Sequence, residues 1–221
     1  MNPASPPTHP QSEGIFTRKL PPLLLWLLAI NVVIELALMA GDMGLLGINL
    51  RAYAYGFGAF WSGLLRGGEP LYASQPVVMF LTHAFLHGGI LHLAMNMLAL
   101  VVLGQRLLAR MTPGAFLALY IASAIGGGLA FGLISDSPRP MVGASGALFG
   151  LLGALEYRVW RTMRRGRMSM QPFWRSIGEL VLLNALLWLV LGGGLAWEAH
   201  LGGFLAGWLA AVLGRRFWGW R

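Results

Sequence analysis

The 221-residue chain is 57% hydrophobic and only 11% charged, with a formal net charge of +8. Soluble domains carry roughly 25% charged residues, so this composition indicates an integral membrane protein and leaves no room for a large soluble domain. The chain has no cysteine, which excludes thiol catalysis, cysteine-zinc sites and disulfides.

Six apolar runs approach the roughly 20 residues that a helix needs to cross a bilayer. They are residues 20–40, 79–104, 114–134, 144–157, 177–194 and 198–214. The fourth run holds about 14 residues, or about 20 Å of helix, against a hydrocarbon core of about 30 Å. The pattern therefore predicts an all-α polytopic membrane protein, a six-transmembrane-helix bundle whose short central fourth helix begins inside the membrane.

The apolar runs divide the chain into one membrane domain and two short ends. Residues 1–19 are rich in proline and serine and are predicted to form a disordered cytoplasmic tail. Residues 20–216 are the predicted six-helix domain, with 41–76 as a long external loop, and 217–221 are the cytoplasmic C-terminal end. The first run is expected to be a transmembrane helix and not a cleavable signal, because no small-residue cleavage site follows it at the required spacing.

The basic residues predict the orientation of the bundle, because cytoplasmic loops carry an excess of lysine and arginine. Of the 16 basic residues, only Arg51, Arg66 and Arg139 fall on the opposite side of the predicted membrane from the rest. Both termini are therefore expected in the cytoplasm, and Ser145 in the outer half of the membrane. The basic excess is thus a topology signal that also allows contact with anionic lipids, and it does not indicate nucleic-acid binding.

Ser145 lies in the segment MVGASGALFG, residues 141–150, where small residues recur. Two stripes of small residues are present: Gly143, Gly146, Gly150 and Gly153, at spacings of three and four along the start of the fourth run, and Ala199, Gly203, Ala206 and Gly207 at similar spacing in the sixth. Such stripes let two helices approach closely in lipid. Packing these helices together would bring Ser145 next to His200. Spacing alone leaves open whether Ser145 serves packing or chemistry.

Histidines cluster in the second run, where polar side chains are costly and indicate function. His92 and Asn96 share a helix face, and both can donate the hydrogen bonds that a developing oxyanion needs. A polar contact between helices is the alternative. His83 and His87 have the spacing of a metal-binding pair, but no third ligand accompanies them in a matching position. We therefore expect them to pin the outer loop by hydrogen bonds and do not expect a metal site.

A serine nucleophile needs a base, and often a carboxylate that orients the base. Glu156 and Glu179 lie near predicted cytoplasmic helix ends, and Glu198 points away from His200 on a helix. Glu35 lies in the outer half of the first helix, but no feature of the sequence connects it with His200. The residues therefore predict a serine–histidine dyad.

Three segments together resemble the motifs of a known family. HAFLHGGILHLAMN, GASGALFG and AHLGGFLAG, in that order on the second, fourth and sixth predicted helices, look like those of the rhomboid intramembrane serine proteases. The likeness spans about residues 80–210, and it agrees with a six-helix form that has both termini in the cytoplasm. The glycine–serine motif alone is weak evidence, whereas the three motifs together are specific.

The resemblance implies a role for each residue of the candidate site. Ser145 would be the nucleophile and His200 the general base, and the oxyanion hole would comprise His92, Asn96 and the Ser145 backbone amide. The supporting residues would be Gly143 in the loop, Phe149 stacked on the catalytic histidine, Gly203 and Gly207 in the tight helix contact, and His83 and His87 in structural roles that help to hold water. Phe149 stands where many members carry tyrosine.

The implied activity is that of an intramembrane serine endopeptidase that cleaves transmembrane segments of single-span membrane proteins, with no metal and no organic cofactor. The resemblance implies a bacterial inner membrane, contact with lipids, an active site open to the external side and no nucleic-acid partner. The oligomeric state stays open. One alternative is a catalytically inactive rhomboid-like adaptor that binds transmembrane helices. Another is a small transporter or metal-handling protein built around the histidines of the second run, which would leave Ser145 and His200 without a role.

Overall fold

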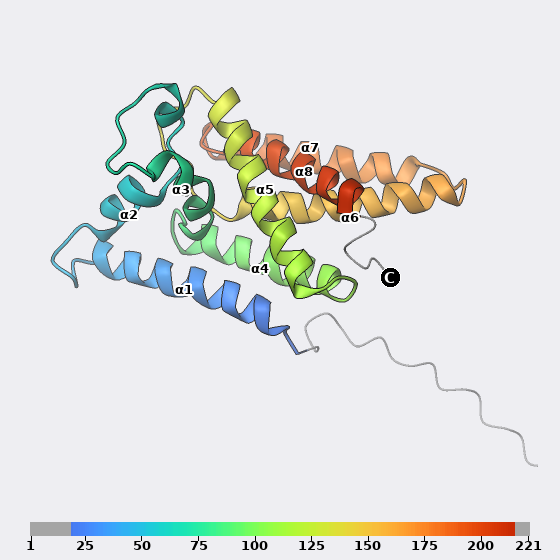
Figure 1. Cartoon of the computed structure of the whole chain (residues 1–221), viewed down its shortest axis with the longest axis horizontal. Helices are drawn as coiled ribbons and strands as arrows, with labels where there is room; N and C mark the ends of the chain where they lie inside the picture. Colours follow the sequence, from blue (N-terminus) through green and yellow to red (C-terminus); the bar gives the residue numbers. More distant parts are fainter. Residues whose placement is uncertain (1–18, 215–221) are drawn as a thin grey trace, which may run out of the picture.

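The computed structural model describes residues 19–214, and the regular elements in that range are helices. The α-helices are α1 (Pro22–Asp42), α2 (Leu50–Gly58), α3 (Gln75–Thr82), α4 (Ile90–Leu108), α5 (Pro113–Ile134), α6 (Ser145–Arg165), α7 (Gln171–Val190) and α8 (Trp197–Leu213), as Figure 1 shows. Two short 3-10 helices are η1 (Ser62–Arg66) and η2 (His83–Phe85). The tail predicted over 1–19, apart from Lys19, and the end predicted over 217–221 lie outside the described residues.

Four of these helices are long and apolar enough to cross a membrane: α1, α4, α5 and α7. The structure therefore agrees with an all-α membrane protein, but it does not confirm the expected count of six or a short fourth helix. The helix that begins at Ser145 is 21 residues long, because it continues past its apolar part into the arginine-rich segment and ends only at Arg165. Arginine is a good helix former, so a change from apolar to basic sequence does not end a helix.

The second apolar run, expected as one segment over 79–104, is broken in the structure. Helix α3 ends at Thr82, η2 follows it, and α4 begins only at Ile90. Gly89 precedes α4 with a φ of 112°, a left-handed conformation that side chains with a Cβ rarely adopt. The apolar run over 79–104 therefore comprises the end of α3, the short η2 and most of α4, with His87 in the loop between η2 and α4.

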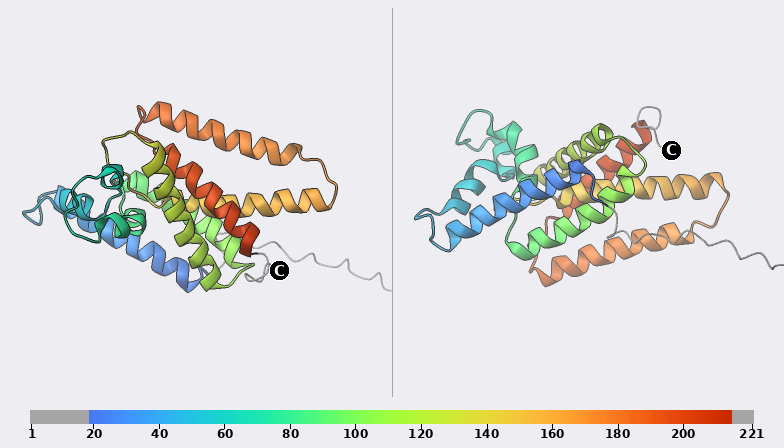
Figure 2. Two further views of the ribbon diagram at one scale, coloured as in Figure 1. Left: turned by 45° about the horizontal axis from the view of Figure 1, so that its top comes forward. Right: turned by 90° about the horizontal axis from the view of Figure 1, so that it is seen from below.

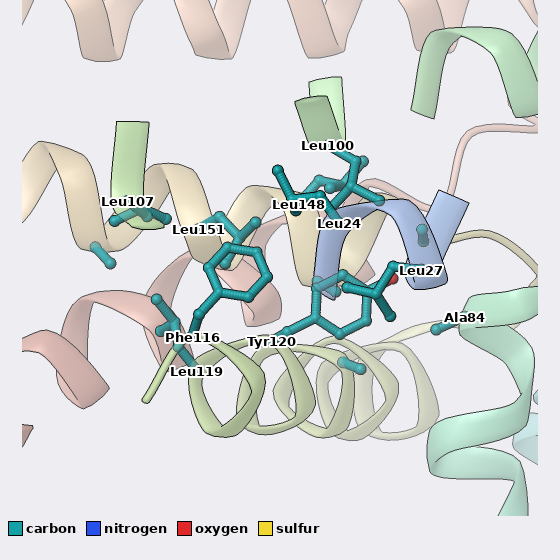
Figure 3. Close-up of a cluster of buried hydrophobic side chains, with 14 of the residues drawn as sticks. Leu24, Leu27, Ala84, Leu100, Leu107, Phe116, Leu119, Tyr120, Leu148 and Leu151 are labelled. Atoms are coloured by element: carbon teal, nitrogen blue, oxygen red, sulfur yellow. The ribbon is translucent and has the colours of Figure 1, made fainter. Parts of the chain in front are cut away.

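The largest buried cluster lies where α1, α4, α5 and α6 meet (Figure 3). Its large side chains include Leu24, Leu100, Phe116, Tyr120 and Leu151, each at most 2% exposed. In lipid, apolar burial gains little from leaving water, so close packing of these side chains supplies much of the attraction between helices. The cluster fixes α6 against α4 and α5 and so holds the start of α6, where Ser145 lies.

Helix α7 lies at the edge of the bundle, beside α6 and α8 (Figure 2). Phe173 is its one buried residue, and most of its other side chains are exposed. Its exposed residues are mainly leucine, valine and tryptophan, a composition that suits contact with lipid tails. Helix α7 is therefore held to the bundle by few contacts.

Candidate active site

Ser145 is the first residue of α6 and is half-buried. The loop before it is tied down at two points. Phe60 and Met141 exchange two backbone hydrogen bonds of 2.9 Å, and the Gly143 amide donates to the His83 carbonyl at 2.9 Å. The first backbone N–H groups of a helix have no partner within the helix, so the Ser145 amide is oriented to donate toward a group in front of this helix end.

Gly143 lies between Ser145 and the imidazole of His92. Its φ is 125°, and a Cβ at this position would lie 2.8 Å from His92 Cε1, 2.9 Å from His92 Nε2 and 3.8 Å from Ser145 Oγ. Both side chains therefore approach the same point beside the Gly143 α-carbon. Only glycine provides both the backbone conformation and the space that this arrangement requires.

The tautomer of His92 follows from its hydrogen bond. The Gly88 amide donates to His92 Nδ1 at 3.1 Å, so Nδ1 carries the lone pair and the proton of the neutral ring is on Nε2. That N–H is on the side of the ring that faces Gly143 and Ser145. Asn96, four residues later and 5% exposed, uses one Nδ2 hydrogen to donate to the His92 carbonyl at 2.8 Å. The second hydrogen of its amide has no acceptor among the described residues.

His200 lies in the first turn of α8 and is 6% exposed. Its ring stacks on Phe149, with centroids 4.1 Å apart and planes within 8°. Phe149 is four residues from Ser145 on α6, so both face the same side of that helix. In the part of the chain that the structure describes, no hydrogen bond joins Ser145 to His200. Catalytic hydrogen bonds are often long in the absence of substrate, and the stack keeps the ring beside the start of α6.

Asn184 on α7 is a neighbour of His200 that the sequence analysis missed. Its Oδ1 lies 2.6 Å from His200 Nδ1. A lone amide within the apolar run of α7 was the available signal, because polar groups are costly in a membrane unless they have a partner. Its spacing from His200 along the chain gives no hint of the contact, since the two residues are on different helices.

The two small-residue stripes lie against each other except for Gly143, which was grouped with the first stripe but lies in the loop before α6 and faces His92. Helix α8 packs most extensively on α6. A Cβ on Gly203 would collide with the carbonyl of Gly146, and one on Gly207 with the carbonyl of Gly150. Ala206, which the spacing grouped with this stripe, instead faces Gly126 of α5. The reason is that α8 lies between α5 and α6, so one face of α8 packs on α6 and the neighbouring face packs on α5.

The carboxylates that the sequence analysis weighed are engaged elsewhere or not in contact with His200. Glu35 is fully buried and pairs with Arg51 at 2.8 Å. Glu156 accepts from Ser176 Oγ at 2.8 Å, and Glu179 pairs with Arg175 at the surface. Within residues 19–214, the hydrogen-bond acceptor at the His200 ring is therefore an amide and not a carboxylate.

His83 and His87 brace the loops around the site through their backbone. The His83 carbonyl accepts from Gly143, as above, and the His87 carbonyl accepts from Arg51 and from the Tyr55 hydroxyl, each at 2.7 Å. Both rings are buried, and their nitrogens have no hydrogen-bond partner among the described residues. The His87 ring contacts that of His92 edge-on, with centroids 5.2 Å apart.

Arg51 links the outer loop to α1 and to the histidine loop. It contacts Glu35, Asp42 and the His87 carbonyl. Partial burial lowers its pKa, but the hydrogen bonds to Glu35 and Asp42 outweigh this and hold the pKa of Arg51 above its ordinary value. Burial also raises the pKa of the Tyr55 hydroxyl. The arginine therefore stays charged and keeps the loop that carries His87 in place.

Comparison with known proteins identifies the family. The model of the rhomboid domain matches residues 74–217. The rhomboid protease GluP of Bacillus subtilis is 36% identical over 161 residues, which cover 71% of this chain and 28% of GluP. RHOMBOID-like protein 5 of Arabidopsis thaliana is 38% identical over 133 residues, or 56% of this chain and 39% of that protein. Rhomboid-like protease 1 of Toxoplasma gondii is 29% identical over 157 residues, or 71% of this chain and 51% of that protein.

The chain thus spans between 28% and 51% of the length of these relatives. Two of the three are named proteases. The apolar helices agree with the membrane location that the composition indicates. The extent of the family match and the relationship to GluP lead to one conclusion: this chain is an integral membrane protein that belongs to the rhomboid family.

Proposed function

We propose that the protein is an intramembrane serine endopeptidase that cleaves transmembrane segments of single-span membrane proteins by a Ser145–His200 dyad. The observation that carries the proposal is the pair of opposite tautomers beside Ser145. His92 accepts a hydrogen bond at Nδ1 and so carries its proton on Nε2. In His200 the Nδ1 proton is donated to Asn184, so the Nε2 of His200 has a lone pair. One ring can donate to an oxyanion, and the other can accept the serine proton.

The proposed reaction uses these groups in sequence. Ser145 Oγ attacks the scissile carbonyl carbon as His200 Nε2 takes its proton. The negative oxygen is stabilised by His92 Nε2–H, the free hydrogen of Asn96 Nδ2 and the Ser145 amide. His200 then gives its proton to the leaving amine as the C–N bond breaks, and a water activated by the same ring hydrolyses the acyl-enzyme. The buried ring nitrogens of His83 and His87, which have no hydrogen-bond partner within residues 19–214, support a role in holding such water, because buried polar atoms need a partner.

The proposed topology has six crossings: α1, α4, α5, α6, α7 and α8. Both termini are cytoplasmic, 41–76 is external, and the start of α6 opens toward the external side of a bacterial inner membrane. The arginine asymmetry of the sequence supports this orientation. Reporter fusions within 161–170 should read as cytoplasmic and fusions within 50–70 as external, and a cytoplasmic signal from 50–70 would overturn it.

The proposed activity is tested with purified protein in lipid vesicles and a single-span membrane substrate. The wild-type protein should cut the substrate within or beside its transmembrane segment, and Ser145→Ala should not. The thermal unfolding temperature should be the same for both, since alanine suits close helix packing as well as serine does. Cleavage by Ser145→Ala would exclude the proposed nucleophile, and a lack of cleavage by the wild-type protein across varied substrates would favour a membrane adaptor.

A further inference from the structure

Asn184 is the one amide in the otherwise apolar stretch 180–190 of α7. An amide that faces lipid without a partner costs several kcal/mol. Here it is half-buried, while Leu183 and Leu186 on the same helix are exposed. Asn184 is therefore turned inward from the lipid-facing side of α7, toward α8 and His200.

Two hydrogen bonds fix the orientation of the Asn184 amide. Its Nδ2 donates to the Leu180 carbonyl at 2.9 Å, so Oδ1 is the atom that faces His200 Nδ1 at 2.6 Å. An amide oxygen accepts but cannot donate, so the bond requires a proton on Nδ1. In the neutral imidazole this leaves Nε2, on the opposite edge of the ring, as the acceptor.

We propose that Asn184 is a positioning residue that holds His200 in the tautomer and orientation of a general base. This inference rests on the proposed function and adds a third member to its dyad. The Phe149 stack fixes the plane of the ring but also suits a ring turned by a half-turn about its Cβ–Cγ bond, which would exchange Nδ1 with Cδ2. The hydrogen bond to Asn184 removes this freedom and directs Nε2 away from α7. A base is commonly oriented in this way by a third group.

Helix α7 is suited to a test of this role because it is lightly packed. A hydrogen bond from Ser176 to Glu156 joins α7 to α6. Asn184→Leu keeps the size of the side chain, removes the acceptor and suits lipid. Asn184→Asp keeps an acceptor oxygen in the same place. Ser176→Ala removes the hydrogen bond from α7 to Glu156 without a change near His200, so it is the matched control.

The experiment measures kcat, KM and the labelling rate of Ser145 by a fluorophosphonate for these variants and for Ser145→Ala. Asn184→Leu should lower kcat and the labelling rate on the order of 10- to 100-fold, part of the 10²- to 10⁴-fold that a general base contributes, with little change in KM. Asn184→Asp should restore most of the activity and move the acidic limb of the pH–rate profile to higher pH, because a carboxylate stabilises the imidazolium. Ser176→Ala should match the wild-type protein.

A second readout uses the wild-type protein alone and does not depend on the folding of a variant. The ¹⁵N NMR shifts of His200 should show a protonated Nδ1 and an unprotonated Nε2 at neutral pH. The proposal is overturned by the opposite tautomer, or by wild-type kcat and labelling in Asn184→Leu while Ser145→Ala is inactive. Cleavage by Ser145→Ala would instead reject the proposed function itself, so the two failures are distinguishable.

Discussion

The α-carbon of Gly143 lies against the imidazole ring of His92, so close that a Cβ there would be 2.8 Å from the ring. The same position is 3.8 Å from Ser145 Oγ, so one glycine separates the proposed nucleophile from a proposed oxyanion donor. A side chain at this position would move the two groups apart.

Gly143→Ala is therefore expected to reduce cleavage more than 10-fold. The alanine would have to adopt a φ of 125° and displace the His92 ring, and misplacing a catalytic group by about 1 Å can cost 10²-fold in rate. The measurement is kcat/KM with a single-span substrate. Gly114→Ala is the control, because a Cβ at Gly114 meets no atom within 4 Å, and it should retain full activity. Equal activities of the two variants would contradict the proposed geometry.

The oxyanion hole predicts a second result. His92→Ala and Asn96→Ala should each lower kcat, on the order of 10²- to 10³-fold if the lost donor is not replaced, while KM changes little. The proposed donors act on charge that develops only in the transition state, so their loss should not weaken substrate binding. Steady-state kinetics in detergent provide both constants. Wild-type kcat in both variants would remove these residues from the proposed mechanism.

The buried Glu35–Arg51 pair predicts a large effect on stability. Arg51→Met leaves the fully buried Glu35 carboxylate without this partner. We expect a loss of about 3 kcal/mol, the lower end of the range for a broken buried pair, because 19% of the Arg51 side chain is exposed. Arg175→Met, which breaks the exposed pair with Glu179, should leave the thermal unfolding temperature nearly unchanged.

The sign of the pH dependence follows from the raised pKa of Arg51. Its contribution to stability is fully present below the ordinary arginine pKa and is lost only as the pH rises through the higher value in the folded protein. The difference in unfolding temperature between wild type and Arg51→Met should therefore not shrink as the pH is raised from neutral to mildly alkaline. A difference that disappears over this range would contradict the assignment.

The contact between α6 and α8 predicts opposite outcomes for two glycines. Gly207→Ala places a methyl group against the Gly150 carbonyl, and overpacking of this kind costs about 1–3 kcal/mol. Gly178 lies in α7, where a Cβ meets no atom within 4 Å, so Gly178→Ala should be neutral or stabilising by up to about 1 kcal/mol. Thermal unfolding in one detergent compares the two, and equal destabilisation would contradict the packing.

The sequence was informative wherever a pattern within one segment sets the structure. The spacing of Gly203 and Gly207 predicts close packing beside Ser145, and the two glycines meet the backbone of α6. The length of an apolar run was a less reliable guide to helix boundaries. The run over 79–104 predicts a single helix, although the adjacent glycines Gly88 and Gly89 are typical of a break between helices. Asn184 could be recognised as unusual, but its contact with His200 depends on how α7 docks, and no local pattern encodes that.

The central claim is that Ser145 is a nucleophile made reactive by His200. It is tested most directly by incubating the membrane-reconstituted protein with a fluorophosphonate and locating the adduct by peptide mass spectrometry. One adduct is expected, on Ser145; it should be absent in Ser145→Ala and form far more slowly in His200→Ala while both variants stay folded. Labelling of Ser145 at the wild-type rate in His200→Ala, or no adduct on Ser145 in a protein that cleaves its substrate, would contradict it.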